Sequence, residues 1–289
     1  MLLYALLSNF FFALGSQFFT HFSKKVGSIW MNWFKASIAQ IFFILWLLFN
    51  GGIPYLTLEI SVFLLTSGAL GLGLGDIFLL AAFKQIGPGR TLMLFAFQPL
   101  LMGFGGHLFF GQGMETHRLW AIIFFILCVL IISLENFKSN KHWGVKGISL
   151  AFAGMVLDVI GVMITRYSYE ASPELEAYTV NVYRTFGALA FFWLLSFFKK
   201  DLSLFKPLKR FTRNEIIWVS VGSIFGTFLS LTFYLMAIQK AHLGSLSGVA
   251  ITATLFSALF ECLWEKKRPS RYLLTAFLSF LIGMKILVL

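Results

Sequence analysis

The stretch SGALGLGLGDIFLLAAFKQIGPG, residues 67–89, returns in altered form as GSIFGTFLSLTFYLMAIQKAHLG, residues 222–244. A shift of 155 positions places Gly71 on Gly226 and Gly75 on Ser230. Small residues four positions apart form a flat stripe on a helix, which lets another helix approach closely in lipid. An apolar unit that occurs twice predicts a molecule built of two related halves.

The composition indicates that the chain lies in a membrane. Of its 289 residues, 58% are hydrophobic and only 12% are charged, and the mean hydropathy is +0.84. Soluble domains carry about a quarter charged residues. Because the low charge extends along the whole chain, we expect an all-α integral membrane protein. The formal net charge of +11 is assigned to basic loops beside the membrane, so no nucleic-acid partner is predicted.

Ten apolar runs are long enough to be membrane spans. Open sheet edges cannot lie in hydrocarbon, and the alternation typical of barrels is absent, so each run is predicted to be a transmembrane helix. The runs cover residues 2–21, 28–49, 60–83, 89–110, 118–135, 147–167, 176–198, 215–238, 243–264 and 271–289.

A polar, charged segment divides these runs into two sets of five. We predict a first five-helix repeat at residues 1–137, a basic polar linker at 138–146 and a second five-helix repeat at 147–289. Because each repeat holds an odd number of spans, the second enters the membrane from the opposite side, and the two repeats are inverted.

The basic residues predict the orientation in the membrane. With ten spans, most of the 23 Lys and Arg residues fall on the side opposite to the two termini. The positive-inside rule makes that side cytoplasmic. We therefore expect a multi-pass protein of the cell (inner) membrane with cytoplasmic basic loops and with both termini outside.

Two segments carry a resemblance to a known family. They are LLAAFKQIGPGRTLMLFAFQPLLMGFGGHLFFGQ, residues 79–112, and YLMAIQKAHLGSLSGVAITATLFSALFECLWEKK, residues 234–267. With the five-plus-five arrangement, they resemble the EamA-type family of the drug/metabolite transporter superfamily. The resemblance implies a substrate cavity between the repeats, lined by the first, third and fourth helices of each. It also implies export or exchange of small metabolites, amino acids among them.

The chain departs from that family's pattern in places. The family typically has a proline within the fourth helix of each repeat and a glutamate at that helix's end. Pro99 fits in the first repeat, but Thr254 stands at the matching place in the second. Glu261 or Glu265 fits in the second repeat, but Gln112 stands in the first. The resemblance therefore bears on the fold more than on the solute.

The most informative site candidate is Asp158, in the middle of the sixth span. An ionisable side chain within a span costs roughly 2.5–3.5 kcal/mol on insertion scales, so it needs a partner or water. A shift of 149 positions places Asn9, in the first span, on Asp158. Inverted repeats bring both to the interface where transporters bind solutes. Asp158 could hold a substrate amine or a proton, or it could form a structural ion pair with Arg184 on the neighbouring span.

Three further charges lie within spans. Asp76 follows the glycine stripe and could line the inner vestibule, cap a close helix contact, or pair with Lys35 or Lys84. Lys35 and Arg184 are equivalent positions of the second and seventh spans. The family resemblance places these spans at the periphery, so we predict structural roles for Lys35 and Arg184.

Neutral polar side chains complete the predicted substrate-binding set. Each of them could instead hydrogen-bond a neighbouring helix or its own backbone. Gln98 is favoured because Pro99 beside it frees a backbone carbonyl. The whole predicted set is Asn9, Gln17, Asp76, Gln98, Asp158, Tyr234 and Thr254.

Other chemistry is not indicated. The histidines and cysteines lack the spacing of metal ligands, and the spans contain no evident nucleophile–base pair. We therefore predict no catalytic residue, no cofactor, no metal and no enzyme. The predicted function is a secondary transporter or exporter of a small organic metabolite, with an amino-acid-like solute favoured, working by alternating access at a midplane cavity. The alternative is a channel-like or non-transporting bundle. The expected partners are the lipid bilayer and a small-molecule solute, and a homodimer is allowed.

Overall fold

The computed structural model shows helices and no strands in the part of the chain that it describes. That part comprises residues 2–86, 91, 92, 94–113, 116–140, 145–198, 204–239, 243, 246, 249, 252–264, 268 and 270–288. Within it, six helices are long and apolar enough to cross a membrane. The all-helical membrane class is therefore confirmed, whereas length and composition support six spans and not all of the predicted ten.

The first half begins with two long helices that are joined at Gly27, where the positive φ of 88° favours glycine. The third long helix is interrupted by a π-helical segment. The elements are α1 (Leu2–Val26), α2 (Ser28–Phe49), α3 (Leu58–Ser67), the π-helix η1 (Gly68–Gly75), α4 (Asp76–Ile86), the 3-10 turn η2 (Phe95–Phe97), α6 (Gln98–Phe110) and α7 (Thr116–Asn140).

The second half repeats this order. Its elements are α8 (Val145–Ala171), α9 (Ala177–Phe198), the 3-10 helix η3 (Lys206–Arg210), α10 (Arg213–Ser223), the π-helix η4 (Ile224–Leu229), α11 (Ser230–Ile238), α13 (Thr252–Trp264) and α14 (Arg271–Val288).

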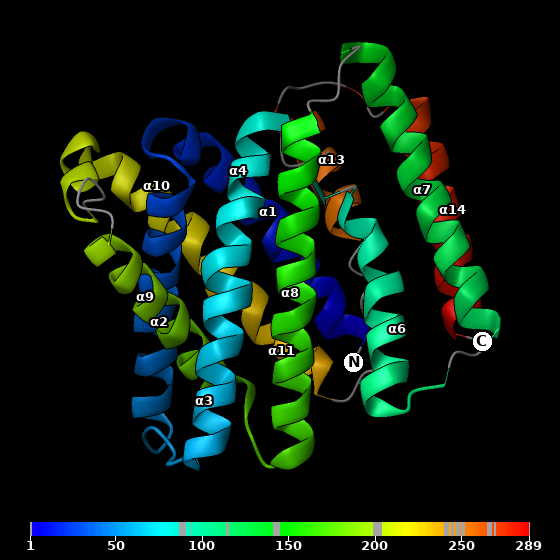
Figure 1. The fold of residues 1–289 in the computed structure, drawn as a ribbon. Coiled ribbons are helices and arrows are strands. Elements are labelled where there is room, and N and C mark those ends of the chain that lie inside the picture. Colours follow the sequence, from blue (N-terminus) through cyan, green and yellow to red (C-terminus); the bar gives the residue numbers. More distant parts are fainter. Residues whose placement is uncertain are drawn as a thin grey trace.

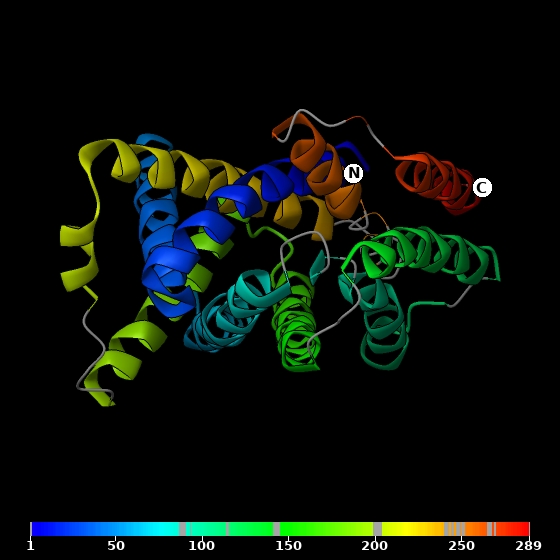
Figure 2. The ribbon, with the colours of Figure 1, turned by 90° about the horizontal axis from the view of Figure 1, so that it is seen from above.

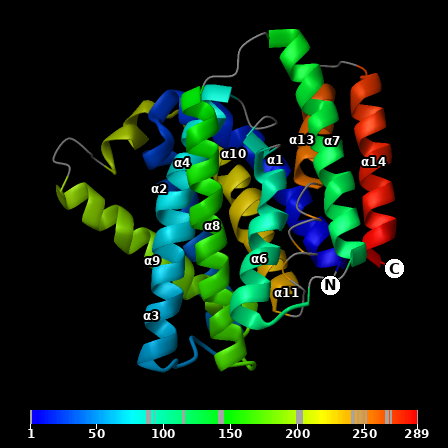
Figure 3. The same cartoon turned by 45° about the vertical axis from the view of Figure 1, so that its right-hand side comes forward.

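Corresponding helices of the two halves run in opposite directions (Figures 1 and 3). Followed from the N-terminal to the C-terminal end in Figure 1, α1 runs upward and α8 runs downward. In the same way, α7 runs upward and α14 runs downward. Both termini lie toward the lower end of the molecule as drawn. The helices α7 and α14 pack along each other at one side of the bundle (Figure 2). This arrangement is the one that five-helix inverted repeats produce.

The π-helical segments η1 and η4 occupy equivalent places in the two halves, and the sequence pattern did not predict them. The sequence of η1 is GALGLGLG. Glycine packs no side chain against the preceding turn, so a stretch rich in glycine leaves the wider π-helical geometry accessible. Such segments are frequent at functional sites.

The small-residue stripe of the first half packs on α8. A methyl group added at Gly161 would lie 3.2 Å from the Cα atom of Gly71 and 3.0 Å from the carbonyl oxygen of Ser67. The hydroxyl of Ser67 donates a 2.7 Å hydrogen bond to the carbonyl of Gly161 and lies 2.7 Å from the hydroxyl of Thr165. The stripe therefore forms the close helix contact that its spacing predicts.

The stripe of the second half packs on α1 in the same manner. A methyl group at Gly15 would collide with the Cα atom of Gly226, and one at Gly222 would meet the side chain of Phe18 at 2.6 Å. The first helix of each half thus lies against the third long helix of the other half. This exchange joins the halves into one bundle.

Two features differ from the predictions: the bounds of the linker and the position of Pro99. The helix α7 continues to Asn140 and α8 begins at Val145, so both ends of the predicted linker 138–146 are helical, while residues 141–144 lie outside the described residues. Pro99 lies in the first turn of α6, directly after the 3-10 turn η2, so the helical run continues through it. The carbonyl of Phe95, four residues before the proline, accepts a hydrogen bond from the backbone N–H of Gln98. The prediction that Pro99 frees a backbone carbonyl was therefore wrong.

We predict that Gly15→Ala lowers the stability of the protein by about 1–3 kcal/mol, because its methyl group would force α1 away from η4. The matched control is Gly103→Ala in α6, since nothing lies within 4 Å of the methyl group that this change adds. The control is expected to keep or raise stability, because alanine favours the helix. Thermal unfolding midpoints of the detergent-solubilised variants measure both effects, and equal midpoints would contradict the close contact.

Candidate functional site

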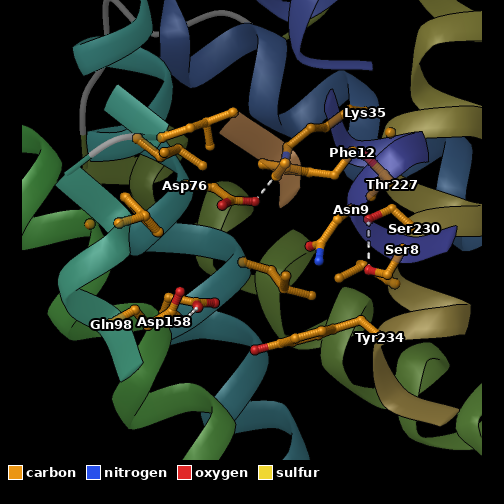
Figure 4. A pocket seen from close by; sticks show the side chains of 18 residues that line it. Ser8, Asn9, Phe12, Lys35, Asp76, Gln98, Asp158, Thr227, Ser230 and Tyr234 are labelled. Carbon is orange, nitrogen blue, oxygen red and sulfur yellow. Dashed lines mark hydrogen bonds and ion pairs between the residues drawn. The ribbon is translucent and has the colours of Figure 1, made fainter. Parts of the chain in front are cut away.

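A cavity of about 110 Å³ lies between the two halves (Figure 4). One wall is formed mainly by α1, η4 and α11, and the opposite wall mainly by η1, α4, α6 and α8, with further lining residues from α2, η2 and α13. Because α1 and α8 are exchanged, each wall contains helices of both halves. The cavity is therefore a product of the interface and belongs to neither half alone.

The wall made by α1, η4 and α11 is polar but uncharged. The hydroxyls of Ser8 and Ser230 lie 3.5 Å apart. The amide of Asn9 donates a 3.0 Å hydrogen bond to the backbone carbonyl of Val249. Tyr234 extends from this wall toward Asp158 on the other (Figure 4). This wall offers hydroxyl and amide groups to a bound molecule.

The opposite wall carries the carboxylates. Asp158 on α8 accepts a 2.7 Å hydrogen bond from the side-chain amide of Gln98 on α6. Asp76, at the first residue of α4, lies on the same side of the cavity (Figure 4). The cavity is therefore chemically two-sided, with acid on one wall and neutral hydrogen-bonding groups on the other.

Lys35 of α2 joins this site through Asp76. Its ammonium lies 2.5 Å from a carboxylate oxygen of Asp76, and the two side chains are 5% and 14% exposed. The ammonium also lies 5.4 Å from the centre of the Phe19 ring, a cation–π contact. Of the interpretations of Asp76, pairing with Lys35 is confirmed, and the pair itself lines the cavity.

Arg184 is fully buried behind the cavity wall, and the Asp158–Arg184 ion pair considered from the sequence does not form. The guanidinium Nε donates a 3.1 Å hydrogen bond to the hydroxyl of Ser67, and its two terminal nitrogens have no hydrogen-bond partner among the described residues. Gly71 lies between the two charged residues: a methyl group there would be 3.8 Å from Arg184 Nη2 and 3.9 Å from the Cα atom of Asp158. Arg184 is thus close to the acidic wall without bonding to its carboxylate.

The cavity brings together most of the predicted set. Asn9, Asp76, Gln98, Asp158 and Tyr234 line it, as does Lys35, for which only a structural role was predicted. Two predicted residues do not line it. They are Gln17, whose amide donates a 2.9 Å hydrogen bond to the hydroxyl of Ser257, and Thr254, which is fully buried.

Sequence reasoning missed three hydroxyl residues of the cavity: Ser8, Thr227 and Ser230. The hydroxyl of Thr227 is buried and has no hydrogen-bond partner among the described residues. One signal was available for Ser230, which is part of the duplicated stripe. Short hydroxyl side chains are common between helices, so their presence alone could not distinguish a lining role from a packing role.

The lining positions are related by the duplication. The shifts of 155 and 149 positions that align the repeats pair residues of the first half with residues of the second. In five such pairs both residues line the cavity, although their polarity differs. The pairs are Leu72 and Thr227, Asp76 and Leu231, Leu79 and Tyr234, Gln98 and Ala253, and Asn9 and Asp158.

The arrangement suits binding more than bond-breaking chemistry. The partly buried carboxylate of Asp158 can accept hydrogen bonds from an ammonium group, and the facing hydroxyls can donate or accept them. In the part of the chain that the structure describes, no group of three or more His, Cys, Asp or Glu side chains could hold a metal ion.

Comparison with known proteins agrees with this picture. A model described as the EamA-like transporter family matches residues 1–134 and 145–289. No curated protein sequence matches the chain. A solved structure entitled "Crystal structure of protein" superposes with a TM-score of 0.76 at 15% identity, covering 98% of this chain and 95% of that one. At that identity the likeness shows the fold alone.

We predict that Lys35→Met lowers stability by about 3–5 kcal/mol, because it leaves the Asp76 carboxylate buried without its partner. Asp76→Leu alone should destabilise similarly by stranding the ammonium. The double variant should recover most of the loss, since replacing both partners by apolar groups removes the uncompensated charge. Unfolding midpoints of the four proteins complete the double-mutant cycle, and additive losses would contradict a direct pair.

Proposed function

Because the chain belongs to the EamA-like transporter family, we propose that it is a secondary transporter that moves a small organic solute across a membrane. One observation carries the proposal beyond the family: a cavity with charged and polar lining lies where the two halves meet. Transporters built from inverted repeats bind solutes and coupling ions at such an interface.

The lining favours an amino-acid-like solute. The Asp158 carboxylate, held by Gln98, would accept hydrogen bonds from an ammonium group. The hydroxyls of Ser8, Thr227 and Ser230 would bind the polar remainder of the solute. The ammonium of Lys35, which is paired with Asp76, also lines the cavity. A zwitterion would thus find both signs of charge in one cavity.

We propose that access alternates by movement of the two walls against each other. Each wall is held together by small-residue contacts, between α8 and η1 on one side and between α1 and η4 on the other. These tight contacts favour motion of each wall as a unit. The equivalent π-helical segments η1 and η4 both border the cavity, so changes in their geometry would alter its lining directly.

A channel-like bundle is the competing function. A channel needs a continuous polar path, with rings of similar groups along it. In the part of the chain that the structure describes, the polar side chains that line this cavity lie together, and the two walls carry different chemical groups. This arrangement favours a site that binds a solute and then releases it. It does not favour a continuously open channel.

We predict that Asp158→Asn reduces solute uptake by at least about ten-fold in proteoliposomes, because the variant loses the charge that attracts an ammonium group. A panel of radiolabelled amino acids, nucleosides and sugars first identifies the solute by counterflow. Glu59→Gln, an exposed charge in the first turn of α3, is the matched control and should transport normally.

Two outcomes would contradict these proposals separately. Normal uptake by a folded Asp158→Asn protein would exclude that carboxylate as a required group. Uptake by the unchanged protein that does not saturate with solute concentration, and shows no counterflow, would favour a channel over alternating access.

The orientation is proposed from the charge pattern: basic loops in the cytoplasm and both termini outside. A fluorescent reporter that matures only in the cytoplasm should stay dark when fused after Leu289 and should fluoresce when inserted after Asn140, at the end of α7. Fluorescence from the fusion after Leu289 would refute the orientation.

A further inference from the structure

The guanidinium of Arg184 is enclosed in the bundle without a bonded counter-charge among the described residues. The side chain is fully buried, and both terminal nitrogens have no hydrogen-bond partner in that part of the chain. The hydrogen bond from Nε to the hydroxyl of Ser67 leaves the charge uncompensated, because a hydroxyl is neutral. An unpaired cation in a membrane span is costly, and arginine does not lose its proton. Arg184 therefore needs an anionic partner in some other state of the molecule.

The protein group best placed to become that partner is Asp158. Of the two carboxylates that line the cavity, Asp158 interacts with the guanidinium charge more strongly than Asp76 does. Asp76 is already bonded to Lys35. A methyl group added at Gly71 would lie 3.8 Å from Nη2 of Arg184 and 3.9 Å from the Cα atom of Asp158. Glycine is thus the residue between the two charges, and it has no side chain to keep them apart.

The present partner of Asp158 is neutral and can be exchanged. The carboxylate accepts a 2.7 Å hydrogen bond from the side-chain amide of Gln98 on α6 (Figure 4). An amide carries no charge, so this bond does not compensate the carboxylate. A cation, either from a solute or from the protein, forms the stronger, charge-assisted hydrogen bond with a carboxylate.

We propose that Asp158 exchanges Gln98 for Arg184 when the cavity is empty, so that Arg184 replaces the cationic group of the departed solute. This inference rests on the proposed transport function and concerns the return of the empty protein. While an ammonium group is bound, it compensates Asp158. After its release, closure of the walls buries a bare carboxylate, which is costly. The ion pair with Arg184 removes that cost, and the empty protein can return for another solute.

The inference separates two modes of transport that can be measured in proteoliposomes. Net uptake into empty vesicles requires the protein to return without solute. Exchange of external solute for preloaded solute does not, because the protein is loaded in both directions. With the solute that the counterflow panel identifies, the unchanged protein is expected to carry out both modes.

The deciding variant is Arg184→Gln, which removes the internal cation. It is expected to lower net uptake by at least about ten-fold and to change exchange by less than about two-fold, because only the empty protein uses Arg184. Arg184→Lys keeps the charge and should restore net uptake. The matched control is Thr179→Val, which removes a buried, unpartnered hydroxyl from the same helix and should leave both modes unchanged.

The inference is overturned if Arg184→Gln lowers both modes equally, because an arginine that only stabilises the fold would affect every step. Unchanged net uptake by that variant overturns it, as does Arg184→Lys if it behaves like Arg184→Gln. If Arg184→Gln does not fold, Arg184→Met gives the same comparison without placing a polar group in the buried site.

The unchanged protein distinguishes failure of this inference from failure of the proposed function. If it exchanges solute but shows no net uptake, the empty protein does not return and the inference alone is overturned. If it transports no member of the panel in either mode, the proposed function is refuted and the inference with it.

Discussion

The close approach of two backbones, once in each half, is the constraint on which the rest of the structure depends. Gly71 meets Gly161 and Gly226 meets Gly15, so the third long helix of one half contacts the first helix of the other at a separation that excludes larger side chains. In lipid, where burial of apolar surface gives little drive for helix association, such packing and interhelical hydrogen bonds hold helices together. The exchange of α1 and α8 follows, and the cavity forms between the two exchanged walls.

The charges within the bundle obey a second constraint, because an unpaired charge in hydrocarbon is costly. Lys35 and Arg184 occupy equivalent positions, but their surroundings differ. Lys35 bonds directly to Asp76, whereas the residue equivalent to Asp76 in the second half is Leu231. The remaining acid, Asp158, lies near Arg184 without bonding to it. These two cations and two carboxylates balance in number, but among the four only Lys35 and Asp76 are bonded to each other. The Asp158 carboxylate is therefore left beside the cavity.

Much of the fold could be predicted from the sequence, because each prediction rested on a local physical rule. Hydropathy located most of the long helices to within about five residues, but α6 begins at Gln98 and α13 at Thr252, nine residues after the predicted starts at 89 and 243. The small-residue spacing predicted the contacts of Gly71 and Gly226. The π-helical segments could not be predicted, since they depend on how a glycine-rich turn packs against its neighbours. Among site residues, Asp158 and Asn9 were indicated by charge and by the duplication. Whether Gln17 faced the cavity or α13 depended on the rotation of α1 about its own axis. No residue pattern near Gln17 determined that rotation.

The duplication makes the scaffold nearly symmetric, but a symmetric cavity could not distinguish one end of a solute from the other. The paired lining positions remove this symmetry. Where one half supplies Asp76 or Gln98, the other supplies Leu231 or Ala253, and Tyr234 stands opposite to the equivalent Leu79 on the acidic wall. Helix geometry has thus been retained while polarity has been exchanged between equivalent sites. If the proposed function holds, a solute with a charged end and a hydrogen-bonding end would bind in one orientation, because each wall offers its own chemistry.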